Sequence, residues 1–251
     1  MVGLCNKVHL NIGLKIREIF WVHRKYLIIE LKCAHWLLKE NGQKSLKIYN
    51  SNRKFIYLIS PNKIKKDFYS SLEKVLSQRK VKYFQLRLKN TSLQKKIKIG
   101  KKIQRICKKF KVKFLINDNP WLAKKLDADG CHLGQKDTDI VSARKILSKK
   151  IIGITCHNSI NLAKKAIQQK ADYLAIGAFF ATKTKKIRFK ASINDLKKIK
   201  SITKKPIVAI GGINNKNYKN LLLNNANFLA ISSYIFNNKK YKPEEAIKKL
   251  K

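Results

Sequence analysis

The stretch IIGITCHNSINLAKKAIQQKADYLAIG, residues 151–177, contains the repeating unit that decides the fold. It begins and ends with short apolar runs, IIGIT (151–155) and YLAIG (173–177). Between them, apolar residues from Ala163 onward recur at three- and four-residue spacing, and Asn158 is the predicted N-cap of that helix. The stretch therefore predicts a strand, a covering helix and a second strand.

The same alternation continues on both sides of this unit. The further apolar runs are FIYLI (55–59), YFQLR (83–87), KFLIN (113–117), DGCHL (129–133), PIVAIG (206–211) and FLAIS (228–232). Apolar strands separated by helices indicate a parallel sheet covered on both faces. Eight such units predict an α/β protein with a closed (β/α)₈ TIM barrel. A doubly wound open sheet is the alternative, but no Gly-rich dinucleotide fingerprint follows the first strand.

Residues 1–54 do not follow this alternation. We therefore divide the chain into an N-terminal extension, 1–54, and a barrel domain, 55–251. The extension is compatible with one or two amphipathic helices, with a poorly ordered arm, or with translation from an upstream start codon. No function is assigned to it.

The chain carries 58 Lys and Arg against 14 Asp and Glu, a formal net charge of +44. Such charge is typical of nucleic-acid binding when it is gathered into one stripe. Here the lysines are spread over every predicted helix, and Lys, Asn and Ile are in excess together, as genome-wide composition bias would produce. We favour that interpretation over a specific nucleic-acid partner, and expect a modest, salt-sensitive affinity for polyanions.

The cysteines and the apolar runs bear on location. Five cysteines without CxxC spacing favour a reducing compartment over a disulfide framework. No apolar run approaches the ~18 residues of a membrane-spanning helix. We expect a cytoplasmic protein without a membrane partner. The sequence leaves open whether it forms a homo-oligomer.

Polar side chains gather where each predicted strand ends, which is where TIM barrels carry their chemistry. The groups are Gln85, Arg87 and Lys89; Asn117 and Asp118; Gln135 and Asp137; Thr155; Thr182, Thr184 and Lys185; Gly212; and Ser233. Each group alone has a structural explanation, such as a barrel layer, a turn or a helix cap. Their joint placement at one end of the barrel favours a functional site.

Two Cys-His pairs, 131–132 and 156–157, raise the alternative of a zinc site. Adjacent strand residues point to opposite faces, so each pair offers only one inward ligand. We predict structural or supporting roles for both pairs.

Five of the 14 acidic residues fall between Asp118 and Asp139. Asp118 and Asp137 follow strand ends, whereas Asp127 and Asp129 lie before and at the opening of a strand. Asp139 is predicted to cap the next helix. The pair at the strand ends predicts a divalent-cation site completed by substrate phosphates.

The basic and glycine-rich positions predict two phosphate sites. Gly212 and Ser233 follow the last two strands, where many barrels bind phosphate through backbone N–H groups. The second site would place Arg87, Lys89 and Lys185 opposite the acidic pair. From the residues we infer two phosphorylated substrates, with the phosphate group of one leaving as a metal-bound anion.

The ordered set resembles the thiamine-phosphate synthase/TenI superfamily. The resemblance rests on QLRLK (85–89), IND (116–118), ADGCHLGQKD (128–137), IGITCH (152–157), ADYLAIGAFFATKTK (171–185), VAIGGIN (208–214) and FLAISSYIF (228–236). It implies a (β/α)₈ barrel that couples hydroxymethylpyrimidine diphosphate to hydroxyethylthiazole phosphate and releases diphosphate.

The resemblance also implies roles for single residues. Asp118 and Asp137 would hold Mg²⁺. The diphosphate would be gripped by the catalytic cations Arg87, Lys89 and Lys185, and by Asn117. Gln85 and Thr155 would contact the aminopyrimidine, and Thr182, Thr184, Gly212 and Ser233 the thiazole phosphate.

The chain departs from the superfamily pattern in places. Thr155 stands where Ser is common, and Ala178 and Ala181 stand where the loop after strand six usually has prolines. A TenI-like thiazole tautomerase or non-catalytic relative is the main functional alternative, because such proteins do not need the diphosphate-binding residues. A basic nucleic-acid-binding barrel is the second.

Overall fold

The computed structural model describes residues 54–182 and 188–250. Within them, eight parallel strands close into a barrel in sequence order, with β8 pairing back onto β1. The strands are β1 (Ile56–Ile59), β2 (Val81–Leu86), β3 (Lys113–Asn117), β4 (Gly130–Leu133), β5 (Ile151–His157), β6 (Tyr173–Gly177), β7 (Ile207–Ile210) and β8 (Phe228–Ile231). The predicted TIM barrel is confirmed, and the open-sheet alternative is wrong because the β1–β8 ladder leaves no edge.

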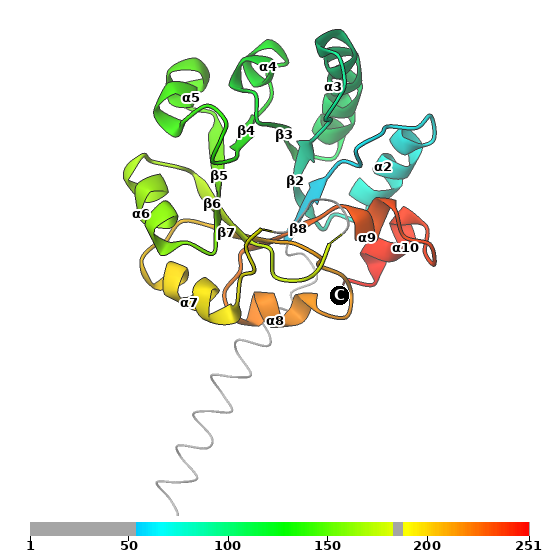
Figure 1. Cartoon of the computed structure of the whole chain (residues 1–251). Helices are drawn as coiled ribbons and strands as arrows, with labels where there is room; N and C mark the ends of the chain where they lie inside the picture. The colour runs from blue at the N-terminus through cyan, green and yellow to red at the C-terminus, as the bar shows by residue number, and fades with distance from the viewer. Residues whose placement is uncertain (1–53, 183–187, 251) are drawn as a thin grey trace, which may run out of the picture. The chain divides into compact units, whose positions relative to one another are not determined.

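The helices form a ring outside the strands (Figure 1). They are α2 (Phe68–Leu76), α3 (Leu93–Lys109), α4 (Pro120–Lys125), α5 (Ile140–Leu147), α6 (Ile160–Gln168), α7 (Ile193–Ser201), α8 (Tyr218–Leu223), α9 (Ser233–Phe236) and α10 (Pro243–Lys248). Their amphipathic character explains the arrangement. In α3, for example, Gly100, Ile103 and Cys107 are buried against the barrel while its lysines face solvent.

Helix starts follow from local hydrogen bonding. Asp139 caps α5 as predicted, because its side chain accepts from the Ser142 N–H at 3.0 Å. The predicted cap of α6 is wrong by one residue. Ser159, not Asn158, accepts from the Leu162 N–H, and the Asn158 side chain instead donates to the Lys190 carbonyl.

The barrel interior is filled by aromatic and aliphatic side chains. Tyr57 and Tyr173 are each 2% exposed and belong to one cluster with Leu115 and Val208. Gly153 makes room for this packing, since a Cβ there would lie 1.9 Å from the Tyr173 ring. The core is thus built from large residues facing small ones.

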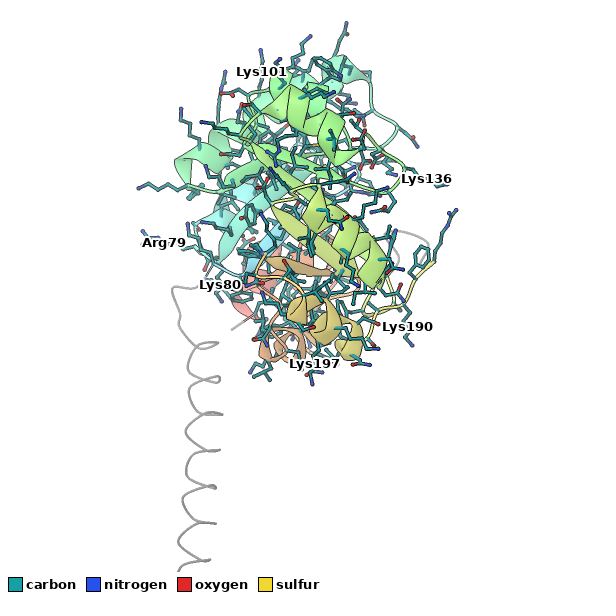
Figure 2. All side chains as sticks on the ribbon, turned by 90° about the vertical axis from the view of Figure 1, so that its left-hand side faces the viewer. Arg79, Lys80, Lys101, Lys136, Lys190 and Lys197 are labelled. Atoms are coloured by element: carbon teal, nitrogen blue, oxygen red, sulfur yellow. The ribbon has the colours of Figure 1, made fainter. Side chains whose placement is uncertain are left out.

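Basic side chains project from several parts of the described barrel. Figure 2 shows Lys101 on α3, Lys136 after β4 and Lys197 on α7 projecting outward from well-separated parts of the molecule. The predicted dispersion of lysine over the helices is therefore visible in the structure. Among the described helices, none combines the length and apolar character needed to cross a bilayer.

The predicted extension, residues 1–54, lies outside the described residues except for Lys54. The proposed boundary between 54 and 55 therefore stays a prediction.

Candidate active site

Asp118 and Asp137 form a carboxylate pair at the carboxyl ends of β3 and β4. Asp118 follows β3 directly with a backbone φ of 65°, and its N–H donates to the His132 carbonyl at 2.8 Å. In the turn after β4, Asp137 Oδ2 accepts from the Gly134 N–H at 2.7 Å. A Cβ on Gly134 would lie 2.8 Å from that oxygen, so glycine lets the turn close around the carboxylate. The backbone therefore positions both acids.

The electrostatics show that the two acids interact. Burial, together with the hydrogen bond and repulsion from Asp137, raises the pKa of Asp118 from 3.8 to about 6. Lys89 and Arg87 act in the opposite direction on the same pKa. Two carboxylates and two cations are thus gathered at one end of the barrel, as the sequence predicts.

This pair fits the predicted Mg²⁺. Across residues 54–182 and 188–250, no group of three or more His, Cys, Asp or Glu side chains is placed to hold a metal. The carboxylates that the described residues offer at this end of the barrel are those of Asp118 and Asp137. Mg²⁺ is commonly bound by one or two carboxylates, with substrate phosphates and water completing its octahedron. The donor set suits a metal that arrives with a phosphorylated substrate.

The β1 and β2 ends fix the cationic side. The Arg87 N–H donates to Ser60 Oγ at 2.9 Å, and its guanidinium Nη1 donates to Asn62 Oδ1 at 3.1 Å. Arg87 is half-buried, whereas Lys89 is exposed at the rim. The segment after β1 therefore holds the arginine in place, and its charge acts on Asp118. The sequence prediction missed Ser60 and Asn62, although the polar turn that follows the first apolar run was the available signal.

Gln85 and Asn117 contact each other across β2 and β3. Gln85 is 2% exposed, and its Nε2 donates to Asn117 Oδ1 at 3.2 Å. Both were predicted to bind substrate, Gln85 at the pyrimidine and Asn117 at the diphosphate. The contact brings these two side chains together, and their substrate roles stay predictions.

Thr155 stands at the predicted position in β5 and joins two side chains from β4 and its loop. Its Oγ1 lies 2.9 Å from His132 Nε2, and its carbonyl accepts from the Gln135 side-chain amide. His132 also contacts the Tyr173 hydroxyl through Nδ1 at 2.8 Å. His132 is 8% exposed, and both of its ring nitrogens contact side-chain hydroxyls.

A cavity lies beside the ends of β7 and β8. This cavity of about 500 Å³ is lined by residues that include Thr182, Gly212 and Ser233, all predicted for the thiazole phosphate. Gly212 has a φ of 62°, and a Cβ there would lie 2.3 Å from the Ala181 carbonyl oxygen. Glycine is therefore required where the turn after β7 meets the loop after β6.

Thr184 and Lys185 lie outside the described residues, so their predicted roles stay predictions. The parts of that loop that are described are tied to the barrel by backbone hydrogen bonds. The Phe179 N–H donates to the Ile210 carbonyl at 3.1 Å, and the Ala191 N–H to the Ala178 carbonyl at 2.8 Å.

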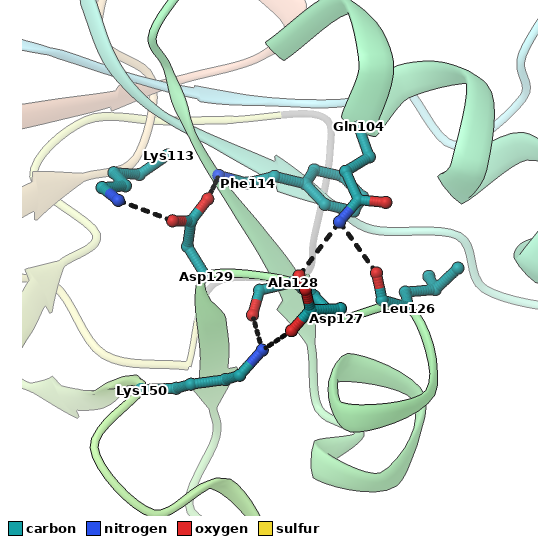
Figure 3. A network of polar contacts seen from close by, with 8 residues as sticks. All are labelled: Gln104, Lys113, Phe114, Leu126, Asp127, Ala128, Asp129 and Lys150. Atoms are coloured by element: carbon teal, nitrogen blue, oxygen red, sulfur yellow. Dashed lines mark hydrogen bonds and ion pairs between the residues drawn. The ribbon is translucent and has the colours of Figure 1, made fainter. Parts of the chain in front are cut away.

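Two further acids of the cluster, Asp127 and Asp129, precede β4 and so lie at the opposite end of the barrel. Figure 3 shows Asp129 bound to Lys113 Nζ at 2.7 Å and to the Phe114 N–H at 2.9 Å. Lys150 contacts Asp127 and the Ala128 carbonyl. These carboxylates tie neighbouring strand segments together, and their position before and at the opening of β4 is the one predicted from the sequence.

The chain is similar in sequence to a family of known proteins. The model of a family described as thiamine monophosphate synthase matches residues 56–235. A thiamine-phosphate synthase of Pelagibacter ubique is 69% identical over 201 residues, covering 80% of this chain and 97% of that protein. A thiamine-phosphate synthase of Persephonella marina is 38% identical over 184 residues, covering 72% and 87% respectively.

The solved structures include a similar barrel. A thiamine phosphate pyrophosphorylase from Pyrococcus furiosus superposes with a TM-score of 0.70 at 29% identity, covering 80% of this chain and 95% of that one.

Proposed function

This chain belongs to the thiamine monophosphate synthase family, and from that premise we propose how its site works. The reaction couples hydroxymethylpyrimidine diphosphate to hydroxyethylthiazole phosphate and releases diphosphate and thiamine phosphate. The observation that carries the assignment of roles is the pairing of Asp118 with Asp137 beside Arg87 and Lys89. A TenI-like tautomerase would have no diphosphate to hold with such a set.

The acidic pair and the two cations form the diphosphate end of the site. Bound Mg²⁺ would supply positive charge to the departing diphosphate oxygens. Arg87, held by Ser60 and Asn62, and Lys89 add donors on the same anion. Stabilisation of a leaving group that gains charge in the transition state accelerates a dissociative step without a base or a nucleophile from the protein. Asn117, oriented by Gln85, would add a neutral donor there.

The cavity beside β7 and β8 would receive the thiazole phosphate. Thr182 and Ser233 contribute hydroxyls, and the Gly212 turn brings backbone into the wall. The pyrimidine would then lie between these phosphate sites, against Gln85 and Thr155. This order brings the thiazole nitrogen to the carbon that loses diphosphate.

A coupling assay with matched variants tests the proposal. The purified protein should form thiamine phosphate from the two substrates in the presence of Mg²⁺, and a chelator should stop the reaction. Asp137→Asn should lower kcat/KM by on the order of 100-fold, as the loss of one well-placed electrostatic partner does. Asp139→Asn is the control, because it lies two residues away, removes the same charge and keeps an N-cap side chain.

Two outcomes would contradict the assignment. If a folded protein yields no product with Mg²⁺, it is not a synthase. If Asp137→Asn and Asp139→Asn lose activity equally, the effect is one of net charge and not of metal binding.

The proposal also covers the location of the protein and the class of its partners. The thiols of Cys107, Cys131 and Cys156 are buried and free of disulfides, which supports the proposed reducing, cytoplasmic location. The lysines project from separate parts of the surface (Figure 2), which supports substrate phosphates over a specific nucleic acid as the partner.

A further inference from the structure

Four side chains form a hydrogen-bonded chain that runs through the barrel interior to the predicted pyrimidine subsite. The Tyr57 and Tyr173 hydroxyls are 2.8 Å apart, and the Tyr173 hydroxyl is 2.8 Å from His132 Nδ1. His132 Nε2 is 2.9 Å from Thr155 Oγ1. The two tyrosines are 2% exposed and His132 8%. None of the first three residues has a role in the function proposed above.

The protons of these four hydrogen-bonded side chains have one arrangement in which every buried donor has an acceptor. Among the described residues, Tyr173 is the hydrogen-bond partner of the Tyr57 hydroxyl. Burial raises the pKa of both phenols above their ordinary value, so each keeps its proton. A buried O–H without an acceptor is costly, so Tyr57 donates to Tyr173. The Tyr173 proton must then go to His132 Nδ1.

The consequence passes through the imidazole to Thr155. Because Nδ1 accepts, the single proton of a neutral ring stands on Nε2, which donates to Thr155 Oγ1. A proton on Nδ1, whether in the other tautomer or in the cation, would leave one phenol O–H unpaired. With its oxygen accepting from His132, Thr155 has its own proton free to donate elsewhere.

The rings around the chain hold this arrangement. The His132 and Tyr173 rings are stacked at 15° with centroids 5.7 Å apart. Gly153, whose Cβ would lie 1.9 Å from the Tyr173 ring, leaves that ring its space. The orientation of the imidazole is therefore fixed by packing as well as by hydrogen bonds.

We propose that Tyr57, Tyr173 and His132 are positioning residues that fix Thr155 as a hydrogen-bond donor to an acceptor nitrogen of the pyrimidine substrate. The inference rests on the proposed function for the identity of that substrate. The assignment of the His132 tautomer, on which the inference is built, does not depend on the proposed function. The hydrogen-bonded side chains would thus affect the binding of the pyrimidine, and not that of the diphosphate or the thiazole phosphate.

The tautomer is tested by nitrogen NMR on the full chain. With ¹⁵N-labelled histidine, the long-range ¹H–¹⁵N spectrum separates protonated from unprotonated ring nitrogens for each of the five histidines. The His132 signals, assigned by their loss in His132→Gln, should show an unprotonated Nδ1 and a protonated Nε2. A proton on Nδ1 in the wild type would overturn the proposal, whatever the activity of the protein.

Kinetics test the link to substrate. Tyr173→Phe removes the donor to Nδ1, so KM for the pyrimidine diphosphate should rise by roughly three- to tenfold, the usual effect of one neutral hydrogen bond. The kcat and the KM for the thiazole phosphate should change little. Tyr83→Phe is the matched control, because its ring packs against Tyr57 and Tyr173 but it is not part of the chain.

A double-mutant cycle separates positioning from loosened packing. In a Thr155→Val background, which keeps the shape and lacks the hydroxyl, Tyr173→Phe should have no further effect on the pyrimidine KM. An unchanged effect in that background would show that Tyr173 does not act through Thr155. Should Tyr173→Phe fold poorly because Tyr57 loses its acceptor, Tyr57→Phe/Tyr173→Phe removes that orphan donor and gives the same kinetic test.

An inactive wild type would contradict the proposed function alone. An active wild type with the wrong tautomer, or with equal effects of Tyr83→Phe and Tyr173→Phe, would contradict only the positioning role.

Discussion

At the scale of single residues, Gly153 shows how one missing side chain shapes both the core and the site. It pairs in register with Tyr173 on the neighbouring strand β6, and the tyrosine ring fills the volume that a Cβ on Gly153 would need. The same ring carries the hydroxyl that contacts His132. A glycine inside a strand is normally unfavourable, so its presence here reflects the close approach of that ring.

Gly153→Ala is therefore expected to destabilise the protein. The added methyl would lie inside the ring contact, and overpacking of this kind typically costs about 1–3 kcal/mol of unfolding free energy. Urea denaturation of the metal-free protein measures the loss. The combination Gly153→Ala/Tyr173→Leu should be less destabilised than the sum of its parts, because the clashing ring is gone. Simple additivity would mean that the ring is not the cause.

Asp118 gives a pH dependence whose sign follows from its pKa. Its native pKa is about 6 against 3.8 when unperturbed, so between these values the native state holds more protons than the unfolded state. Its contribution to the stability of the metal-free protein therefore falls as pH rises through this window, and the penalty is complete above it. Asp118→Asn removes the ionisation and with it the penalty.

With a chelator present, Asp118→Asn should melt above the wild type at pH 7, and the difference should shrink toward pH 4. Thermal scans across pH measure it. Asp139→Asn is the contrasting control, since backbone hydrogen bonding from Ser142 lowers the pKa of Asp139. The thermal midpoint of that variant should not rise above that of the wild type at pH 7. A constant offset for Asp118→Asn at all pH values would show that ionisation is not responsible.

At the scale of elements, helix α7 carries the chain away from the loop after β6. Its N-terminus is held by a capping box in which the Ser192 hydroxyl accepts from the Asp195 N–H and the Asp195 carboxylate accepts from the Ser192 N–H. Just before it, the Ala191 N–H donates to the Ala178 carbonyl at 2.8 Å. The cap thus anchors one end of the loop beside the candidate phosphate cavity.

Ser192→Ala should lower the unfolding free energy by about 1 kcal/mol, since it leaves a helix N–H without its cap. Ser201→Ala on the same helix is the control. The Ser201 hydroxyl donates to the Lys198 carbonyl at the exposed end, so its loss should stay within about 0.5 kcal/mol. Chemical denaturation measures the unfolding free energy of both variants. Equal losses in the two would argue against a stabilising role of the Ser192 cap.

The alternation of apolar strands and amphipathic helices made the barrel predictable. KFLIN (113–117) and YLAIG (173–177) match β3 and β6 residue for residue. Strand ends elsewhere shifted by one or two residues because ladder pairing, not composition, sets where a strand stops. The Asn158 cap failed for a related reason, since Ser and Asn cap equally well and only the backbone path selects Ser159.

The sequence also predicts that Asp118 and Asp137 lie at one end of the barrel, because each follows a parallel strand. It did not reveal the Tyr57–Tyr173–His132–Thr155 chain. These residues lie on β1, β6, β4 and β5, and their contact depends on barrel closure and on the space left by Gly153. The support of Arg87 by Ser60 and Asn62 depends likewise on the neighbouring β1.

At the scale of the whole molecule, charge is the dominant feature. With 58 basic and 14 acidic residues, one-to-one pairing would give about a quarter of the cations a carboxylate partner. The ion pairs at the barrel, such as Arg144 with Asp172 at 2.7 Å, relieve a few of them. Positive charge remains in large excess, and a large net charge of one sign destabilises the compact state by self-repulsion.

Added chloride salt should therefore stabilise this protein. The Debye length falls from about 30 Å at 0.01 M to about 8 Å at 0.15 M, which removes most long-range repulsion between surface lysines. The thermal midpoint should rise across that range and then level off, because screening saturates. Chloride is used because phosphate or sulfate would also bind the candidate phosphate sites and stabilise by mass action. Sucrose is the comparison, since excluded osmolytes stabilise without screening and without such a plateau. A midpoint that is flat or falls between those salt concentrations would mean that the lysines do not strain the fold, and that the charge is neutral with respect to stability.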